Sequence, residues 1–148
     1  MDFLIFISLL ALGYFAGSWA EKKHYVSILE REKSLLQLPT VTGRKGYEEG
    51  NVAGAEMVLG NAVISVDYFK RILASLRNIF GGTIRSYETL IDRARREAIL
   101  RMKESAPEGT EIIVNVRVET STIGKNSHKK SVSCVEALAY GTALVTSR

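Results

Sequence analysis

One apolar stripe at helical spacing constrains this 148-residue chain more than any other feature. Apolar side chains recur along one side of the segment at Tyr87, Leu90, Ile91, Ala94, Ala98 and Met102. This spacing predicts an amphipathic helix with one buried side. The remaining side carries Glu88, Asp92, Arg93, Arg96 and Lys103 and is predicted to face water. The two alanines within the stripe allow the helix to lie close to the surface that it covers.

Two segments near the C-terminus, in which apolar and polar residues alternate, supply the surface that this helix covers. One side of the first carries Ile112, Val114, Val116 and Val118, and one side of the second carries Val135, Ala137, Ala139, Ala143 and Val145. Gly124, Lys125 and Asn126 between them are turn residues, so an antiparallel hairpin is predicted. Its other side is mixed, with Asn115, Arg117 and Glu119 on the first strand and Cys134, Glu136, Leu138 and Tyr140 on the second.

Two further elements are predicted upstream of the stripe. Residues 56–66 alternate as a strand, with Val58, Ala62 and Ile64 on one side. Asp67 is a suitable N-cap for a helix over residues 68–80, and Gly81 and Gly82 end it. The predicted fold class is therefore α+β, a small antiparallel sheet packed against two helices within residues 38–148.

The N-terminal segment predicts one transmembrane helix before this domain. Residues 3–20 contain no charge, and as a helix they would span about 27 Å of a hydrocarbon core of about 30 Å. Lys22 and Lys23 follow at once, which places the N-terminus outside and the C-terminal domain in the cytoplasm of a single-pass cell-membrane protein. The alternative is a cleaved signal peptide, but the segment lacks the positive n-region of such peptides.

The organisation expected from these elements has three parts. Residues 1–20 form the transmembrane helix and residues 38–148 the folded domain. Residues 21–37 contain neither proline nor glycine and continue the helix as a stalk until Pro39 stops it.

Composition and ligand inventory exclude several classes of function. The single cysteine excludes an intramolecular disulfide. The arginines of the long helix alternate with acidic residues and have no aromatic platform beside them, which argues against nucleic-acid binding.

Cys134, His24 and His128 form no CxxC or HxxxH motif, so Cys134 is interpreted as a small apolar strand residue. A metal would need a symmetric ring of Cys134 or Glu136 from several subunits. No metal site, cofactor or catalytic constellation is predicted, and the chain is expected not to be an enzyme.

Four segments, in this order, resemble the YbjQ family: LRNIFGG, SYETLIDRARREAILRM, IIVNVRVETSTI and EALAYGTAL. The resemblance covers about residues 38–145. It implies a dodecin-like fold, assembly into a pentamer and a heavy-metal-binding label, in a family whose biochemical role is not established. Some members of that family also carry an N-terminal hydrophobic segment.

The candidate site is a subunit interface. Arg77 and Asn78 precede the Gly-Gly turn, where an arginine can cap helix carbonyls or contact a neighbouring subunit or an anionic ligand; both readings stay open. Arg117, Glu136 and Tyr140 lie on the mixed side of the hairpin, and Arg117 and Glu136 are expected to pair within or between subunits.

The function predicted from the sequence is a membrane-anchored homo-oligomeric binding or scaffold module. The alternative is a heavy-metal- or small-ligand-binding oligomer acting in stress or envelope homeostasis.

Overall fold

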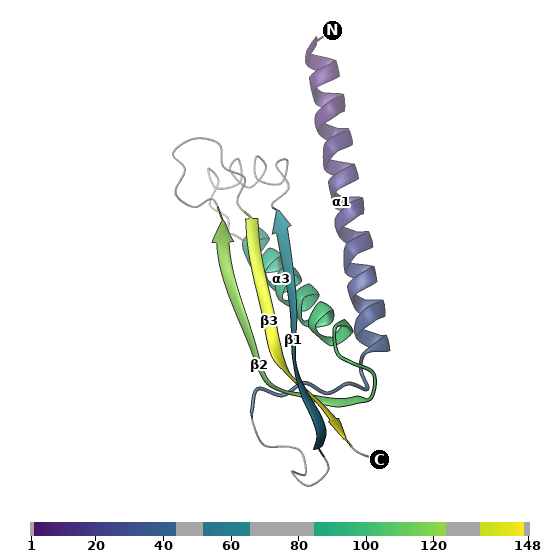
Figure 1. Cartoon of the computed structure of the whole chain (residues 1–148). Coiled ribbons are helices and arrows are strands. Elements are labelled where there is room, and N and C mark those ends of the chain that lie inside the picture. The colour runs from purple at the N-terminus through teal and green to yellow at the C-terminus, as the bar shows by residue number, and fades with distance from the viewer. Residues whose placement is uncertain (1, 44–51, 66–84, 124–133, 147–148) are drawn as a thin grey trace.

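A computed structural model of the chain describes residues 2–43, 52–65, 85–123 and 134–146. Its helices are α1 (Asp2–Ser34) and α3 (Arg85–Glu104), and its strands are β1 (Val52–Ser65), β2 (Thr110–Ile123) and β3 (Cys134–Thr146) (Figure 1). This arrangement confirms the predicted α+β class. The helix expected over residues 68–80, its Gly81–Gly82 end and the turn at residues 124–126 lie outside the described residues.

The three strands form one antiparallel sheet in the order β1-β3-β2. The predicted hairpin of β2 and β3 is confirmed, and β1 pairs with β3 along its whole length, beginning at Val52 rather than at residue 56. The free edge of β2 is partly covered, because Val41 donates its backbone N–H to Ile113 over 2.9 Å beside a parallel bridge at Thr40. The other edge of β1 has no strand partner among the described residues.

The apolar stripe of α3 packs on one face of this sheet (Figure 1). Ala94, Ala98 and Met102 are fully buried, and Leu90 and Ile91 pack at the margin of the same cluster. The opposing sheet residues are the predicted ones on β1 and β3, namely Val58, Ala62, Ile64, Val135, Ala137, Ala139 and Ala143. Tyr87 lies in the first turn of α3, but its side chain is outside the described part of the structure.

The alternation predicted for β2 is wrong before Val116. Ile113 and Val116 belong to the core under α3, whereas Ile112 and Val114 do not. The register shifts between Val114 and Arg117, and Asn115 has a φ of 55°. This is a β-bulge, in which one extra residue moves the following side chains to the opposite face. Asparagine tolerates the left-handed conformation that the bulge requires.

α1 is one continuous helix of 33 residues, so the predicted stalk does continue the N-terminal helix, as far as Ser34. Its first half stands clear of the described domain, and its second half lies along α3 (Figure 1). By length and composition α1 is apolar enough to cross a membrane, with a mean hydropathy of 1.9 in its most apolar part. The sheet, α3 and the stalk therefore form one unit from which an apolar helix projects.

Gly60 marks the closest approach of β1 to α3. A Cβ atom added at Gly60 would lie 2.2 Å from the backbone nitrogen of Met102 and 2.4 Å from the carbonyl oxygen of Ala98. Backbone atoms cannot yield as a flexible side chain can, so even the smallest side chain would push the helix off the sheet.

We expect Gly60→Ala to lower the free energy of unfolding by about 3 kcal/mol, the upper end of the usual range for overpacking. Gly54→Ala is the matched control on the same strand, because a Cβ there meets nothing within 4 Å. Thermal unfolding of the two variants measures the difference. Equal melting temperatures would contradict this account of the packing.

Candidate functional site

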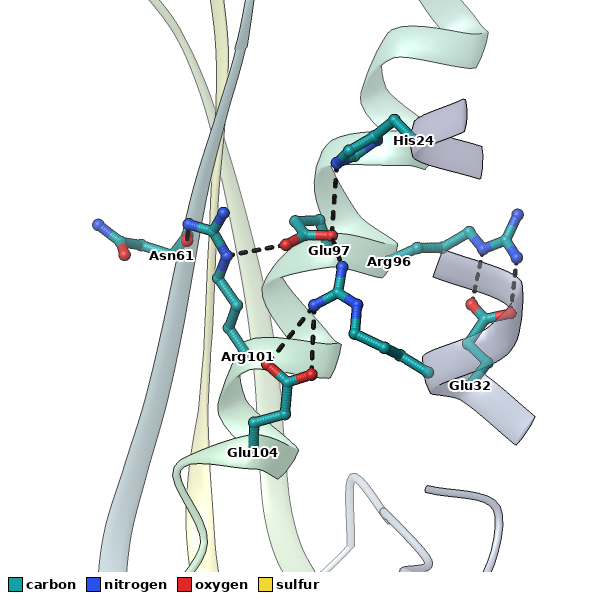
Figure 2. Close-up of polar contacts among 8 residues, drawn as sticks. His24, Glu32, Asn61, Arg96, Glu97, Arg101 and Glu104 are labelled. Atoms are coloured by element: carbon teal, nitrogen blue, oxygen red, sulfur yellow. Dashed lines mark hydrogen bonds and ion pairs between the residues drawn. The ribbon is translucent and has the colours of Figure 1, made fainter. Parts of the chain in front are cut away.

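The side of α3 that faces away from the sheet is covered by α1, and the two helices are joined by charged side chains (Figure 2). We call this the α1–α3 ion-pair seam; it comprises His24, Arg31 and Glu32 of α1 and Arg96, Glu97, Arg101 and Glu104 of α3.

Glu97 is the centre of the seam and is only 4% exposed. Its carboxylate accepts hydrogen bonds from the Arg31 guanidinium and, over 2.9 Å, from Nε of Arg101. Nε2 of His24 lies 3.6 Å from Oε2 of Glu97. Arg31 also donates from Nη1 to Glu104 over 3.2 Å. One buried carboxylate is therefore held by cationic groups from both helices.

A second pair fixes the same two helices beside Glu97. Arg96 donates to both carboxylate oxygens of Glu32, from Nε over 2.7 Å and from Nη2 over 2.6 Å. Such two-pronged pairs are the strongest and most directional of the common ion pairs. Nearer the apolar half of α1, Arg93 lies 3.7 Å from Glu21 and over the ring of Tyr25. The stalk is thus tied to α3 at several successive turns.

The prediction that this side of α3 faces water is correct for Glu88 and Asp92, which are exposed, but wrong for the part of this side that the stalk covers. Glu97 is buried and Arg93 is largely covered, because the stalk packs over them. Ion pairs between residues four apart also occur within α3, from Arg101 to Glu97 and from Arg96 to Asp92. The missed signal lies in the stalk, where Glu21, His24, Ile28 and Arg31 recur at helical spacing and define a second contact side.

Burial and charge act against each other on the titratable groups of the seam. Burial alone would raise the pKa of Glu97, but the hydrogen bonds and charges of Arg31 and Arg101 outweigh it and lower that pKa. Burial lowers the pKa of His24, and the repulsion from Arg93, Arg31 and Arg101 adds to this effect against the attraction of Glu97. Nδ1 of His24 has no hydrogen-bond partner in the described structure. Glu97 is therefore held as a carboxylate and His24 as a neutral imidazole near neutral pH.

The opposite side of the molecule carries the second notable surface, on the sheet face that α3 does not cover. We call it the outer sheet face; its apolar members are Met57, Leu59 and Val63 of β1 and Leu138 and Tyr140 of β3. Leu59 and Val63 are 53% and 55% exposed, and Leu59 lies opposite Tyr140 across the strand pair. A large apolar group on a long edge strand is typical of a surface that another chain covers.

The predicted interface residues of the hairpin lie on this outer sheet face. Arg117 is exposed on β2 and lies opposite Tyr140, whereas Glu136 lies opposite Ser121 and accepts a hydrogen bond from its hydroxyl over 3.2 Å. The register thus separates Arg117 from Glu136, and they do not pair within one subunit. Arg77 and Asn78 lie outside the described residues.

The two candidate metal ligands that the structure describes, His24 and Cys134, lie on different elements and are not brought together. His24 faces Glu97 in the seam, and Cys134 begins β3 opposite Ser65 of β1 and Ile123 of β2. His128 lies outside the described ranges. Among the residues that the structure describes, no three His, Cys, Asp or Glu side chains are grouped so as to hold a metal ion.

Comparison with known proteins gives a consistent picture of the domain. The YbjQ family model, described as "Putative heavy-metal-binding", matches residues 39–147, a region that begins after α1. A UPF0145 protein of Pyrococcus furiosus is 36% identical over 124 residues, covering 83% of this chain and 97% of that protein. A UPF0145 protein of Archaeoglobus fulgidus is 38% identical over 117 residues, covering 78% of this chain and 97% of that protein. The matched region includes the sheet and α3.

The seam yields a prediction about Arg31. Arg31→Gln removes one of the two arginines that bind the buried Glu97 carboxylate, and hydrogen bonds to charged groups contribute about 1.5–3 kcal/mol each. We expect the free energy of unfolding to fall by an amount in that range. Glu104→Gln is the control, because that carboxylate is exposed and its pair with Arg31 is worth less than about 1 kcal/mol. A larger loss in Glu104→Gln, measured by thermal unfolding, would contradict the central role of Glu97.

The seam should also weaken in acid, first through His24. Because its pKa is lower in the folded chain than the unfolded value of 6.5, the unfolded chain takes up the proton first as the pH falls. Stability should therefore decline from about pH 6.5 down to the folded pKa of His24. The Glu97 contribution is present above the unfolded carboxylate pKa and is lost only at lower pH, as the pH falls through the depressed folded value. Melting temperatures measured against pH should show the first decline in the wild type and not in His24→Gln; the same decline in both would refute the assignment.

Proposed function

The chain belongs to the YbjQ family, and on this premise we propose that it is a membrane-anchored, homo-oligomeric binding or scaffold module rather than an enzyme. The observation that carries this proposal is the outer sheet face, an apolar surface beside an open edge strand on a domain that is tied to an apolar helix.

The membrane part of the proposal rests on α1. Residues 3–20 would cross the cell membrane once, with the N-terminus outside, and Lys22 and Lys23 would lie at the cytoplasmic surface before the domain. Because α1 is continuous and its stalk is ion-paired to α3, the domain would be held in a fixed orientation below the bilayer. The strands run roughly along α1, so the sheet would stand upright on the membrane (Figure 1).

The assembly part of the proposal rests on two features, the exposed apolar side chains of the outer sheet face and the edge of β1 that has no strand partner among the described residues. A second copy that covers Leu59, Val63 and Leu138 would remove apolar surface from water, and the open edge of β1 offers backbone groups for strand pairing. Arg117 and Glu136 lie on the same face as the apolar side chains and do not pair with each other within one chain, and in the proposed assembly they would pair between copies. A closed ring would satisfy every such edge. The family resemblance implies five subunits.

The runner-up is a heavy-metal- or small-ligand-binding oligomer in stress or envelope homeostasis, and it rests on the description of the family. Since the described residues of one chain hold no group of three ligands, such a site would be built between copies, from Cys134 or Glu136 around a common axis.

Leu59→Glu tests the assembly proposal. Residues 21–148, which keep the stalk on α3 and contain the family match, should form a multimer by light scattering at micromolar concentration, and Leu59→Glu should reduce its mass to that of a monomer. A buried unpaired carboxylate in the interface is the physical reason. The control is Arg95→Glu, which adds the same side chain at an exposed position of α3 and should leave the mass unchanged. A monodisperse monomer of the unmodified domain would sink the proposal.

A further inference from the structure

α1 carries a second apolar side that the α1–α3 ion-pair seam does not use. The residues of α1 that contact α3 or are buried beside it include Glu21, His24, Tyr25, Ile28, Arg31 and Glu32. An exposed stripe, which we call the α1 stripe, runs along another side of the helix and consists of Leu12, Phe15, Trp19, Lys22, Val26, Leu29 and Lys33.

The spacing of the α1 stripe is that of a coiled coil. Its members are separated alternately by three and four residues, so that Leu12, Trp19, Val26 and Lys33 take one position of a heptad and Phe15, Lys22 and Leu29 the other. A sustained repeat of this kind keeps one seam of a helix directed at a partner helix of the same repeat. The repeat continues without a break from the apolar half of α1 into the stalk.

The stalk portion is the informative one. Exposed apolar side chains within residues 3–20 are expected of any membrane span, but Val26 and Leu29 lie beyond Lys22 and Lys23 and are 53% and 48% exposed. At that level lipid does not cover them. The stalk already buries Ile28, so it has apolar residues both on its α3 side and on the stripe.

We propose that the α1 stripe is a self-association surface, occupied by the α1 stripe of a second copy in a parallel arrangement. This rests on the proposed membrane anchoring, because a shared bilayer fixes all copies of α1 at the same depth and in the same direction. A second copy then presents the same heptad in the same frame, as a parallel coiled coil requires. Lys22 and Lys33 keep their charges in water by extending their stems, and fix the register at a cost in stability.

The arrangement leaves the ion-pair seam intact. The stripe and the α3 contacts lie on different sides of α1, so the helix can bind its own α3 and another α1 at once. Gly13 and Gly17 do not belong to the stripe, because the helical period aligns them with His24, Ile28 and Arg31. Close packing of two α1 helices at Gly13 and Gly17 is therefore an alternative to pairing through the α1 stripe. It predicts contact between copies on the opposite side of α1.

Cysteine crosslinking of the full chain in its native membrane separates these cases. In a Cys134→Ser background, Val26→Cys and Leu29→Cys should form disulfide-linked dimers several-fold faster than Ser27→Cys and Ser34→Cys, which are exposed on the same stalk but off the stripe. Gly17→Cys should be slow. Equal rates at Ser27 and Leu29, or fastest linkage through Gly17→Cys, would overturn the proposal.

Two further measurements distinguish failure of this inference from failure of the proposed function. Fractionation tests the anchor alone: a protein recovered in the soluble fraction refutes membrane anchoring and the α1 pairing with it. Repeating the crosslinking in Leu59→Glu tests independence from the sheet. Linkage through Leu29→Cys that persists there supports a separate α1 contact, and linkage that disappears shows that the stripe does not associate by itself.

Discussion

The structure depends on a close contact between small residues of α3 and β1. Gly60 has no side chain, and Ala98 presents only a methyl group, so the backbones of helix and strand meet directly. This contact lets Met102 reach full burial and makes the core thin and dense rather than broad. It also leaves the far side of α3 available for a second layer, and the stalk of α1 occupies that side.

The charged contacts between α1 and α3 determine where the second layer lies. Burying the Glu97 carboxylate is unfavourable by itself, and Arg31 and Arg101 offset that cost only when α1 is correctly rotated. Rotation matters because the stalk carries apolar side chains on two sides, with Ile28 buried on one side and Val26 and Leu29 exposed on the other. Packing on α3 through Val26 and Leu29 would leave Glu97 buried without Arg31. The seam therefore specifies one side of α1 for α3 more than it adds stability.

The sequence predicted those elements whose burial is one-sided and regular. The stripe of α3 and the inner residues of β1 and β3 repeat at fixed periods, and the periods report the buried side. The bulge in β2 escaped this reasoning because it depends on the φ angle of Asn115 and not on polarity. The burial of Glu97 escaped it because the side chain that binds it, Arg31, is 66 residues away in the chain. A charged residue in a sequence pattern is predicted to be solvent-exposed unless its partner is known. The pattern therefore predicted that this side of α3 faces water.

The ion-paired connection between α1 and α3 would restrict the ways in which copies of this chain could assemble. The outer sheet face and the α1 stripe belong to different elements, and the ion pairs of Arg31 and Arg96 hold those elements in one orientation. In a closed assembly one symmetry operation must therefore bring both surfaces onto their counterparts. A rotation between copies that brings the outer sheet faces together but not the α1 stripes would strain the ion pairs of the seam. In the proposed assembly, both surfaces together would determine the number of subunits, and loosening the seam through Arg31 would let the domains and the helices assemble independently.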